Sequence, residues 1–519
     1  MNLAFLKKIR IIVSLVFTIF ILFVFLDVSY SFQVYLARIV PYVQFVPSLL
    51  SFITLISATG AGFIFILLLT FFFGRIYCSF MCPLGTLQDI FIWLNRKFRK
   101  LFHKKRNVFQ FRNAHNKLRF SILAVTSITF IFGIVFFVNI LDPYSLFGKL
   151  TTTMFRHNVI TFNNLLASIL EKFSIFSVYP IDHKPFNAPL LIFLNLSFLL
   201  IAYYSVKRGR IYCNTICPVG SLLAIVSKYS IFKISFNDEK CSECGLCRKV
   251  CKAECLDNEN RIIDETRCVS CFNCFDSCPD VSFTYKLNYS KKAKSLDAGK
   301  RTFLLRTGVA ATAVSLSSCK KVTGHDDNKY YKKPKPATPP GSIDLYSYKH
   351  KCTACQLCVA ACPTQVLQPS IVEFGLTGLF QPVMDYPNSF CNYDCTACMD
   401  VCPTDAIIPM NREEKKLTQI GVAKLIEEIC VVFVNKKDCG ACSEQCPTKA
   451  VNMVPYENNL SKPVMNPDIC VGCGACEHAC PTKPFRAIYV EANIYHKKAK
   501  KPVIKKIEEK KTDTEDFPF

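Results

Sequence analysis

Cysteines are the residues with which this chain could do chemistry. The sequence contains 30 of them in 519 residues, and 24 fall into six sets of four with the short gaps that are typical of iron–sulfur ligands. A high cysteine count could also indicate disulfides or zinc sites, but zinc sites rarely place four cysteines in one such series. The spacing therefore predicts 4Fe-4S clusters, which transfer single electrons.

The first two sets follow each other closely and predict a two-cluster ferredoxin module. In such a module three cysteines of one set bind one cluster, and the fourth reaches the cluster of the other set. The expected ligands are Cys241, Cys244, Cys247 and Cys278 for one cluster, and Cys268, Cys271, Cys274 and Cys251 for the second. Cys255 is left over, and we expect it to be a packed free thiol.

Four further sets occupy residues 352 to 480 and suffice for four more clusters, which makes six in total. The middle two sets have irregular first gaps, which we interpret as insertions within cluster-binding loops. Spacing does not decide which fourth cysteine crosses to which set. The sixteen residues are Cys352, Cys355, Cys358 and Cys362, then Cys391, Cys395, Cys398 and Cys402, then Cys430, Cys439, Cys442 and Cys446, and finally Cys470, Cys473, Cys476 and Cys480.

A different cysteine pattern occurs twice in the apolar half of the chain. Residues 74–85 and 209–220 both read G-R-I-Y-C-x-x-x-C-P-x-G. On a helical turn this spacing puts both thiols on one face, and the preceding arginine favours thiolates. We expect the four thiols to act together as a further metal or redox centre, although small cysteines could also serve only for close helix approach. They are Cys78, Cys82, Cys213 and Cys217.

Apolar segments must position these repeats. A mean hydropathy of +0.25 with 51% hydrophobic residues indicates that part of the chain lies in lipid. We expect four membrane spans, near residues 11–26, 52–73, 120–141 and 186–206. Lys and Arg are concentrated at the span ends and in the loop from 96 to 119, which the positive-inside rule places in the cytoplasm. Both cysteine repeats then lie at the inner face.

Composition and missing motifs exclude several functions. The net charge of +24 could indicate nucleic-acid binding, but the basic residues are needed at the span ends, and thiolate-ligated clusters add negative charge. No histidine lies inside an expected span and no C-x-x-C-H motif occurs, so haem is not expected. Without a G-x-G-x-x-G motif, neither NAD nor flavin is expected.

The segment between the two cysteine-rich regions is similar to an export signal. Lys300-Arg301 precedes a mildly apolar stretch that ends in a lipobox-like sequence at Cys319, as in twin-arginine signals with lysine in place of the first arginine. A short linker is the alternative interpretation, and whether Cys319 is processed or lipidated stays open. We expect residues 320–342, rich in Lys and Pro, to be a flexible tether.

These patterns predict a multi-domain protein with a four-helix transmembrane domain and α+β bacterial ferredoxin-like modules. The expected parts are a transmembrane domain at 1–228, a two-cluster module at 229–290, an export-signal-like segment and tether at 291–345, a four-cluster domain at 346–497 and a charged tail at 498–519. The protein should be a multi-pass protein of a bacterial inner membrane, with the first module cytoplasmic and the four-cluster domain periplasmic.

Residues 1–290 resemble the membrane ferredoxin NapH of periplasmic nitrate reductase systems, and residues 300–490 resemble its exported four-cluster partner NapG. The resemblance rests on the two C-x-x-x-C-P repeats and the six ferredoxin sets, and it implies electron flow from the membrane quinone pool to a periplasmic redox protein or reductase. This chain departs from that pair by fusing the two parts. The alternatives are an assembly or maturation factor that keeps a partner metalloprotein reduced, and a membrane redox sensor.

Overall fold

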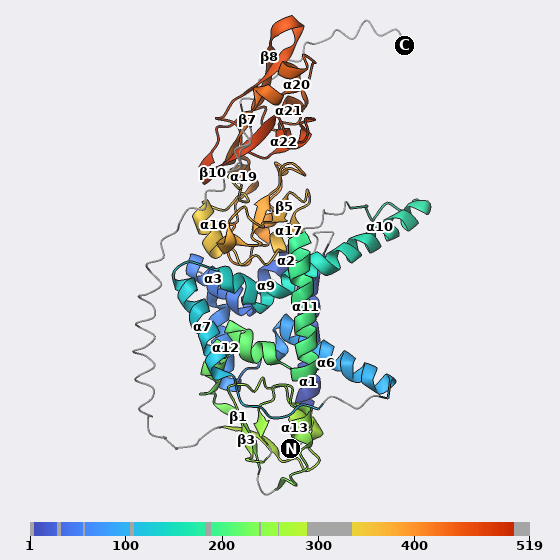
Figure 1. Ribbon diagram of the computed structural model, residues 1–519, viewed down its shortest axis with the longest axis vertical. Coiled ribbons are helices and arrows are strands. Elements are labelled where there is room, and N and C mark those ends of the chain that lie inside the picture. The colour runs from blue at the N-terminus through green and yellow to red at the C-terminus, as the bar shows by residue number, and fades with distance from the viewer. Residues whose placement is uncertain are drawn as a thin grey trace, which may run out of the picture.

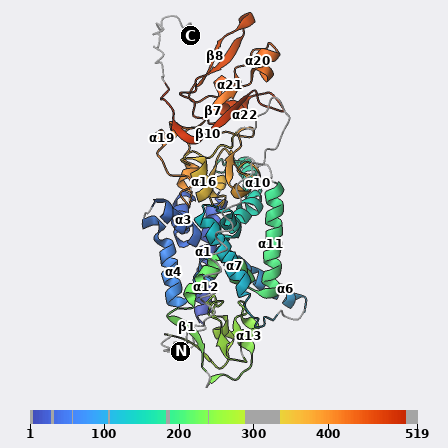
Figure 2. The same ribbon diagram turned by 60° about the vertical axis from the view of Figure 1, so that its left-hand side comes forward.

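The computed structural model describes residues 5–27, 33–55, 58–103, 108–181, 188–237, 240–257, 259–287 and 335–502. The molecule is elongated, with helices in the middle, the two-cluster module at one end and the four-cluster domain at the other (Figure 1). The turned view in Figure 2 shows the same order. Lys300-Arg301 and Cys319 lie outside the described residues.

Two helices of the described part are long and apolar enough to cross a membrane, α1 (Phe5–Leu26) and α11 (Ala188–Arg208). A third span is possible if α2 (Gln33–Ile39), the 3₁₀ turn Val40–Val43 and α3 (Phe45–Leu55), which are bent by 94°, count as one. The chain is thus a membrane protein, but the expected count of four spans is not confirmed.

Two expected spans are interrupted. In place of a helix over 52–73, α4 (Gly62–Phe73) has only 12 residues and is separated from α3. In place of a helix over 120–141, α7 (Asn116–Ile131) ends before Gly133, whose φ of +77° is incompatible with a right-handed helix, and α8 (Phe136–Leu141) follows. Hydropathy alone misses such breaks because the residues on both sides are apolar.

The two cysteine repeats fold in the same way. Gly74 and Gly209 take left-handed φ values of +76° and +59° at the ends of α4 and α11, and Pro83 and Pro218 occupy the first turns of α6 and α12. The cysteines lie in the short turns between. The elements are α5 (Tyr77–Phe80) and α6 (Pro83–Leu101) in the first repeat, and a π-helical turn (Tyr212–Ile216) and α12 (Pro218–Ser227) in the second.

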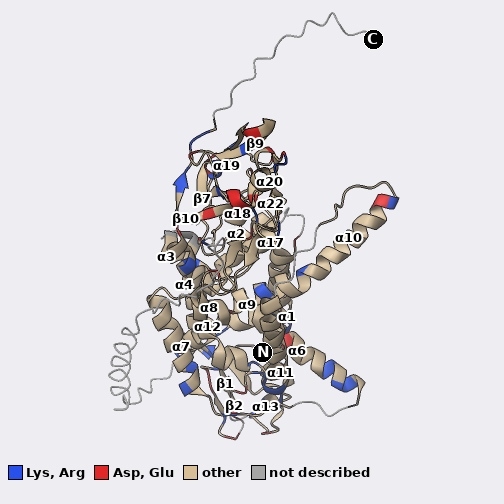
Figure 3. Ribbon diagram, turned by 45° about the horizontal axis from the view of Figure 1, so that its top comes forward, with Lys and Arg blue, Asp and Glu red and all other residues tan. Residues whose placement is uncertain are grey.

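The remaining membrane-proximal helices are α9 (Pro143–Leu150), a π-helical turn (Thr151–Phe155) and α10 (Arg156–Lys172). Both α6 and α10 project away from the bundle (Figure 1). Lys and Arg are visible at the free end of α6, whose last turn contains Arg99 and Lys100 (Figure 3).

The two-cluster module combines short antiparallel pairs with one-turn helices, as ferredoxin loops require. Its strands are β1 (Phe232–Phe236) paired with β4 (Phe283–Leu287), and β2 (Leu256–Asp257) paired with β3 (Ile262–Ile263). Its helices are α13 (Leu246–Val250) and α14 (Asn273–Ser277). Phe272, Phe275 and Phe283 form its small core with Ile234.

The four-cluster domain consists of two halves stacked away from the membrane helices (Figure 1). The near half contains α16 (Leu345–Lys351), α17 (Leu357–Ala361), β5 (Leu367–Pro369), β6 (Pro382–Met384) and α18 (Ala397–Asp400). The far half contains α19 (Arg412–Lys416), β7 (Thr418–Leu425), α20 (Val431–Val434), α21 (Ala441–Glu444), β8 (Val451–Pro455), β9 (Ser461–Met465), α22 (Ala475–Ala479) and β10 (Ile488–Lys498).

The end of the expected tether is packed rather than flexible. Ala337, Thr338 and Ser342 are buried, and the Ala337 carbonyl accepts a backbone hydrogen bond from Met384. Thr338 also contacts His496 of β10 at 3.0 Å. Small residues and prolines can pack closely against a neighbouring surface, so this part belongs to the four-cluster domain.

Candidate redox centres

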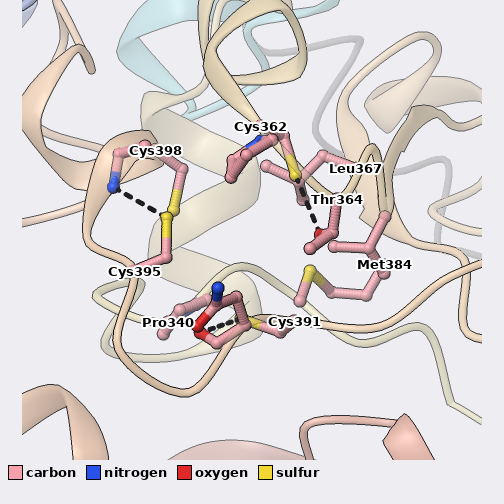
Figure 4. A pocket seen from close by; sticks show the side chains of 12 residues that line it. Pro340, Cys362, Thr364, Leu367, Met384, Cys391, Cys395 and Cys398 are labelled. Carbon is pink, nitrogen blue, oxygen red and sulfur yellow. Dashed lines mark hydrogen bonds between the residues drawn. The ribbon is translucent and has the colours of Figure 1, made fainter. Parts of the chain in front are cut away.

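One cavity of the near half shows how its cysteines are grouped. Its lining includes three thiols of one set, Cys391, Cys395 and Cys398, together with Cys362 from the preceding set. Figure 4 shows these four side chains around the same space, with Leu367 and Met384 beside them. Four thiols around a mostly apolar cavity are the donor set that a 4Fe-4S cluster requires, so the residues fit this group.

A second cavity repeats the arrangement in the far half. It is lined by Cys430, Cys439, Cys442 and the crossing Cys480. The members of the two remaining groups are identified by the thiols that lie close to Cys352 and to Cys476. Burial raises the pKa of Cys352 to about 12, with Cys402 among the thiols that add to the rise. Burial likewise raises the pKa of Cys476, and Cys473, Cys470 and Cys446 add to it. Within each half, the fourth cysteine of one set therefore lies with the first three cysteines of the other set. The spacing had left this pairing open.

In the two-cluster module, too, the fourth cysteine of each set lies with the first three cysteines of the other set. Burial raises the pKa of Cys247 to about 11, and the neighbouring Cys278, Cys244 and Cys241 thiols contribute. Cys274 has Cys271, Cys268 and Cys251 as its electrostatic neighbours. Cys255 is buried, and its sulfur lies 3.6 Å from that of Cys251. The structure thus brings together the two groups expected from the sequence, with the extra thiol beside one of them.

The groups of the four-cluster domain form a row. The backbone N–H of Cys391 donates to the Cys473 carbonyl across the two halves at 2.9 Å. Tyr386 lies between them, donates to the Gly472 carbonyl at 2.8 Å, and has Cys391 and Cys473 as electrostatic neighbours. Starting from the membrane side, the row therefore runs from the Cys352 group through the Cys391 and Cys473 groups to the Cys430 group.

The four membrane thiols also lie together. Cys82 interacts electrostatically with Cys213 and Cys78, and Cys217 interacts with all three of the other thiols. All four are buried, at 3–4% exposure. The grouping that the repeat predicted is therefore present, at the contact between the two related halves.

Reciprocal arginine contacts hold this group. The Arg75 guanidinium donates to the Cys213 carbonyl at 2.9 Å, and the Arg210 guanidinium donates to the Cys78 carbonyl. Each arginine thus crosses to the other repeat. Arg75 also lies 3.7 Å from the Cys78 sulfur, and the Gln88 amide lies 3.2 Å from the Cys213 sulfur. These donors would stabilise negative charge on the sulfurs.

The glycine that ends each repeat is needed for the same packing. A Cβ at Gly85 would overlap the Cys78 carbonyl oxygen, and a Cβ at Gly220 would overlap the Cys213 carbonyl oxygen. The crossing arginines lie next to the same glycines, because Arg210 is close to Gly85 and Arg75 is close to Gly220. The repeated Pro-x-Gly therefore allows the following helix to start directly against the thiol turn.

One carboxylate that we did not predict organises the basic residues. Asp89 forms ion pairs with Arg10 at 2.5 Å, Arg210 at 2.8 Å and Lys252 at 3.0 Å. Three cations around one anion leave positive charge between the membrane thiols and the two-cluster module. A sequence signal existed, because Asp89 is the one acidic residue between Asp27 and Asp142.

Direct contacts link the thiol group to the two-cluster module. Ser79, between Cys78 and Cys82, donates to the Val269 carbonyl at 2.5 Å, and Val269 follows the ligand candidate Cys268. Arg75 donates to the Thr266 carbonyl at 3.0 Å. One apolar cluster contains Cys78, Cys82 and Cys217 together with Cys255 and Val269.

The same apolar cluster continues to the four-cluster domain through Ala354 and Phe380. On the way, Tyr212 donates to the Leu141 carbonyl at 2.9 Å. Lys149, which is fully buried, lies over the Phe380 ring at 5.9 Å from its centroid. The Cys355 carbonyl lies against Gly148. The thiol group is therefore packed between the two cysteine-rich ends of the molecule.

Among the residues that the structure describes, no three His, Cys, Asp or Glu side chains are close enough to hold a single metal ion. This includes the membrane thiols and also the ferredoxin sets. A four-iron cluster is larger than one ion and holds its sulfur ligands farther apart.

Family models match several parts of the chain. A model described as a 4Fe-4S binding domain matches residues 56–101 and 189–237, which include both membrane repeats. A model described as a 4Fe-4S dicluster domain matches residues 351–406 and 437–483, and a further 4Fe-4S binding domain matches residues 238–254. No solved structure is significantly similar to the chain.

Similar proteins come from bacteria and archaea. "Uncharacterized protein MJ0749" of Methanocaldococcus jannaschii is 26% identical over 46% of this chain and 75% of its own length. "Ferredoxin-type protein NapH" of Escherichia coli is 25% identical, with 43% of this chain and 65% of NapH covered. "Methylamine utilization ferredoxin-type protein MauN" of Methylobacillus flagellatus is 26% identical, with 37% and 51% covered. The expected resemblance to NapH is confirmed.

Proposed function

We propose that this NapH-like polyferredoxin transfers electrons from membrane quinol, through 4Fe-4S clusters, to a redox protein in the periplasm. The observation that carries the proposal is the position of the buried thiol group, which is packed between two cysteine-rich modules at opposite ends of the membrane helices. Two independent ferredoxin modules would not require a buried thiol group packed between them.

The chain's own residues would hold and separate the redox groups. Each bound 4Fe-4S cluster would supply one-electron transfer at its site. The thiols of the six ferredoxin groups would bind the clusters, and the short loops would shield them from water. Basic residues around Asp89 would compensate the negative charge of thiolates on either side of them.

The membrane thiols would be a seventh redox group in this proposal. Two features support it: both repeats fall within a family model described as a 4Fe-4S binding domain, and the crossing arginines point donors at the group. Purely structural cysteines would not require the donors from Arg75 and Gln88.

A quinol-to-acceptor assay tests the function. Anaerobically purified protein would be mixed with duroquinol, and cluster reduction would be followed by EPR together with iron and acid-labile sulfide content. We expect cluster signals to appear on quinol addition. Reduction by dithionite but not by duroquinol would instead favour a maturation factor that receives electrons from another donor.

The sidedness is tested separately. A reporter fused after Lys228 should be active in the cytoplasm, and one fused after Phe519 should be active in the periplasm. This expectation rests on the basic loop at 96–119 and on the opposite positions of the two modules. Reporters active on the same side would rule out the proposed transfer across the membrane.

A further inference from the structure

A cavity of about 370 Å³ lies where the bent apolar segment meets the four-cluster domain. One wall comes from residues 37–51 of α2, the 3₁₀ turn and α3, and the other from residues 399–409. Cys402, a thiol of the cluster group nearest the membrane helices, belongs to this lining. The volume is within the range of pockets that hold small organic ligands.

The membrane wall is an irregular segment. Its two helical parts meet at 94°, and backbone of this kind at membrane depth is tolerated where it is covered by protein or lines a cavity. Ile39 and Ile53 on the same segment are 62% and 56% exposed, as lipid-facing side chains would be. A ligand could therefore reach the cavity from the lipid while its tail stayed among apolar side chains.

The cavity also contains a polar pair that connects its two walls. The Ser51 hydroxyl of α3 donates to an oxygen of Asp405 at 2.5 Å. A carboxylate has more acceptor positions than one hydroxyl uses, so Asp405 can accept a further hydrogen bond from a ligand hydroxyl. Ser48 and Tyr42 line the same space. A second carboxylate, Asp400, belongs to the lining as well, beside apolar residues such as Ala37 and Met399. The lining thus combines apolar and polar groups, which suits a ring that carries two hydroxyls.

We propose that this cavity binds the headgroup of a membrane quinol, with the Asp405 carboxylate accepting a hydrogen bond from one of its hydroxyls. This inference rests on the proposed function and assigns its entry point. It places the electron donor beside Cys402, so that electrons enter the four-cluster domain at the end of the row that faces the membrane.

Oxidation of one quinol to quinone breaks two O–H bonds and releases two electrons and two protons. The oxidant would be the 4Fe-4S cluster that the Cys402 group would hold, which would supply one-electron acceptance at this end of the row. The protons go to water on the side of the four-cluster domain. Asp405 is a positioning residue in this scheme.

Photolabelling tests the site directly. The full chain would be labelled with an azidobenzoquinone, with duroquinol as competitor, and the labelled peptides mapped. We expect label within residues 37–51 or 399–409. In Asp405→Asn, which keeps the side-chain shape, the Kd of duroquinol, measured by its competition with the label, should rise about tenfold, because the charge-assisted hydrogen bond from its hydroxyl is lost. Ala37→Phe, which fills the cavity, should abolish labelling there.

The matched control is Asp468→Asn. Asp468 is an exposed carboxylate of the far half that pairs with Lys500, so its replacement should leave the Kd unchanged. Iron content and dithionite-reduced EPR spectra of every variant report whether it has folded. A variant without its clusters is replaced by Ser51→Ala, which removes the donor that orients Asp405 and should also raise the Kd.

The outcomes separate the two proposals. Label in other segments, or an unchanged Kd in Asp405→Asn, overturns this site while reduction of wild-type clusters by duroquinol leaves the proposed function intact. Failure of duroquinol to reduce the wild-type protein overturns both. Label in the cavity that is displaced by duroquinol in the wild type, and displaced only at higher duroquinol concentration in Asp405→Asn, supports the site.

Discussion

Gly85 and Gly220 each lie against a cysteine carbonyl of their own repeat, and neither position has room for a methyl group. We expect Gly220→Ala to destabilise the protein by about 1–3 kcal/mol, the usual cost of overpacking a buried contact. The measurement is the midpoint of thermal unfolding in detergent. Gly440→Ala is the control, because a Cβ there would meet nothing closer than 3.5 Å. Equal midpoints for the two variants would contradict the packing role.

His496 should make the attachment of residues 337–342 dependent on pH. Burial lowers the pKa of His496 from its ordinary 6.5 to about 4, and its Nδ1 has no partner among the described residues. The unfolded segment therefore binds a proton more readily than the folded one between these values. The attachment should be fully stable above pH 6.5 and should weaken, by at most about 3 kcal/mol, as the pH falls toward 4.

Hydrogen exchange of residues 335–344 measures this effect. Protection should decrease from pH 7 to pH 5 in the wild type, after correction for the intrinsic exchange rate. In His496→Gln, which cannot be protonated, the corrected protection should be flat over the same range. A wild-type profile that is also flat would show that the histidine ring is neutral in both states or is not buried in solution.

At the scale of elements, the fourth cysteines are exchanged between neighbouring loops. Cys362, which follows α17, lies with the group whose last thiol, Cys398, is in α18. Cys402, which follows α18, belongs with the group whose last thiol, Cys358, is in α17. Cys362→Ser should therefore alter the same EPR signal as Cys395→Ser, and Cys402→Ser the same signal as Cys355→Ser. Pairing of Cys362→Ser with Cys355→Ser instead would mean that each set binds its own cluster.

The sequence predicted which cysteines lie together better than it predicted the helices that carry them. Cysteine spacing is a local requirement of the cluster, so the six sets and the two repeats are readable from the chain alone. The breaks at Gly133 and between α3 and α4 are not, because long apolar stretches flank both and the uncharged residues at the breaks barely lower the hydropathy. Asp89 was missed for a related reason: its three partners come from positions 10, 210 and 252, and only the fold brings them together.

At the scale of the whole molecule, the membrane thiols should connect the two modules. In Cys78→Ser combined with Cys213→Ser, electrons supplied to the two-cluster module should no longer reach the four-cluster domain. Freeze-quench EPR after reduction from the cytoplasmic side of proteoliposomes measures this transfer. Iron and sulfide bound by the six ferredoxin groups should stay at wild-type levels.

The control for this pair is Cys255→Ser, which removes a buried thiol next to Cys251 but none of the four membrane thiols. Transfer should continue in that variant. Transfer that survives in the double variant would make the four thiols structural, and the reciprocal arginine contacts would then serve helix packing alone.

If the proposed function holds, the row of four cysteine groups, from Cys352 beside the membrane helices to Cys430 at the far tip, would give the domain a capacity for electrons as well as a direction. Four one-electron sites would store the electrons of two quinols. The four sites could thus be reduced while no acceptor is bound. When an acceptor binds, they could transfer two or four electrons to it in quick succession. A multi-electron acceptor would then need only a single encounter, and turnover would be set by how often it docks at the tip rather than by how fast quinol is oxidised.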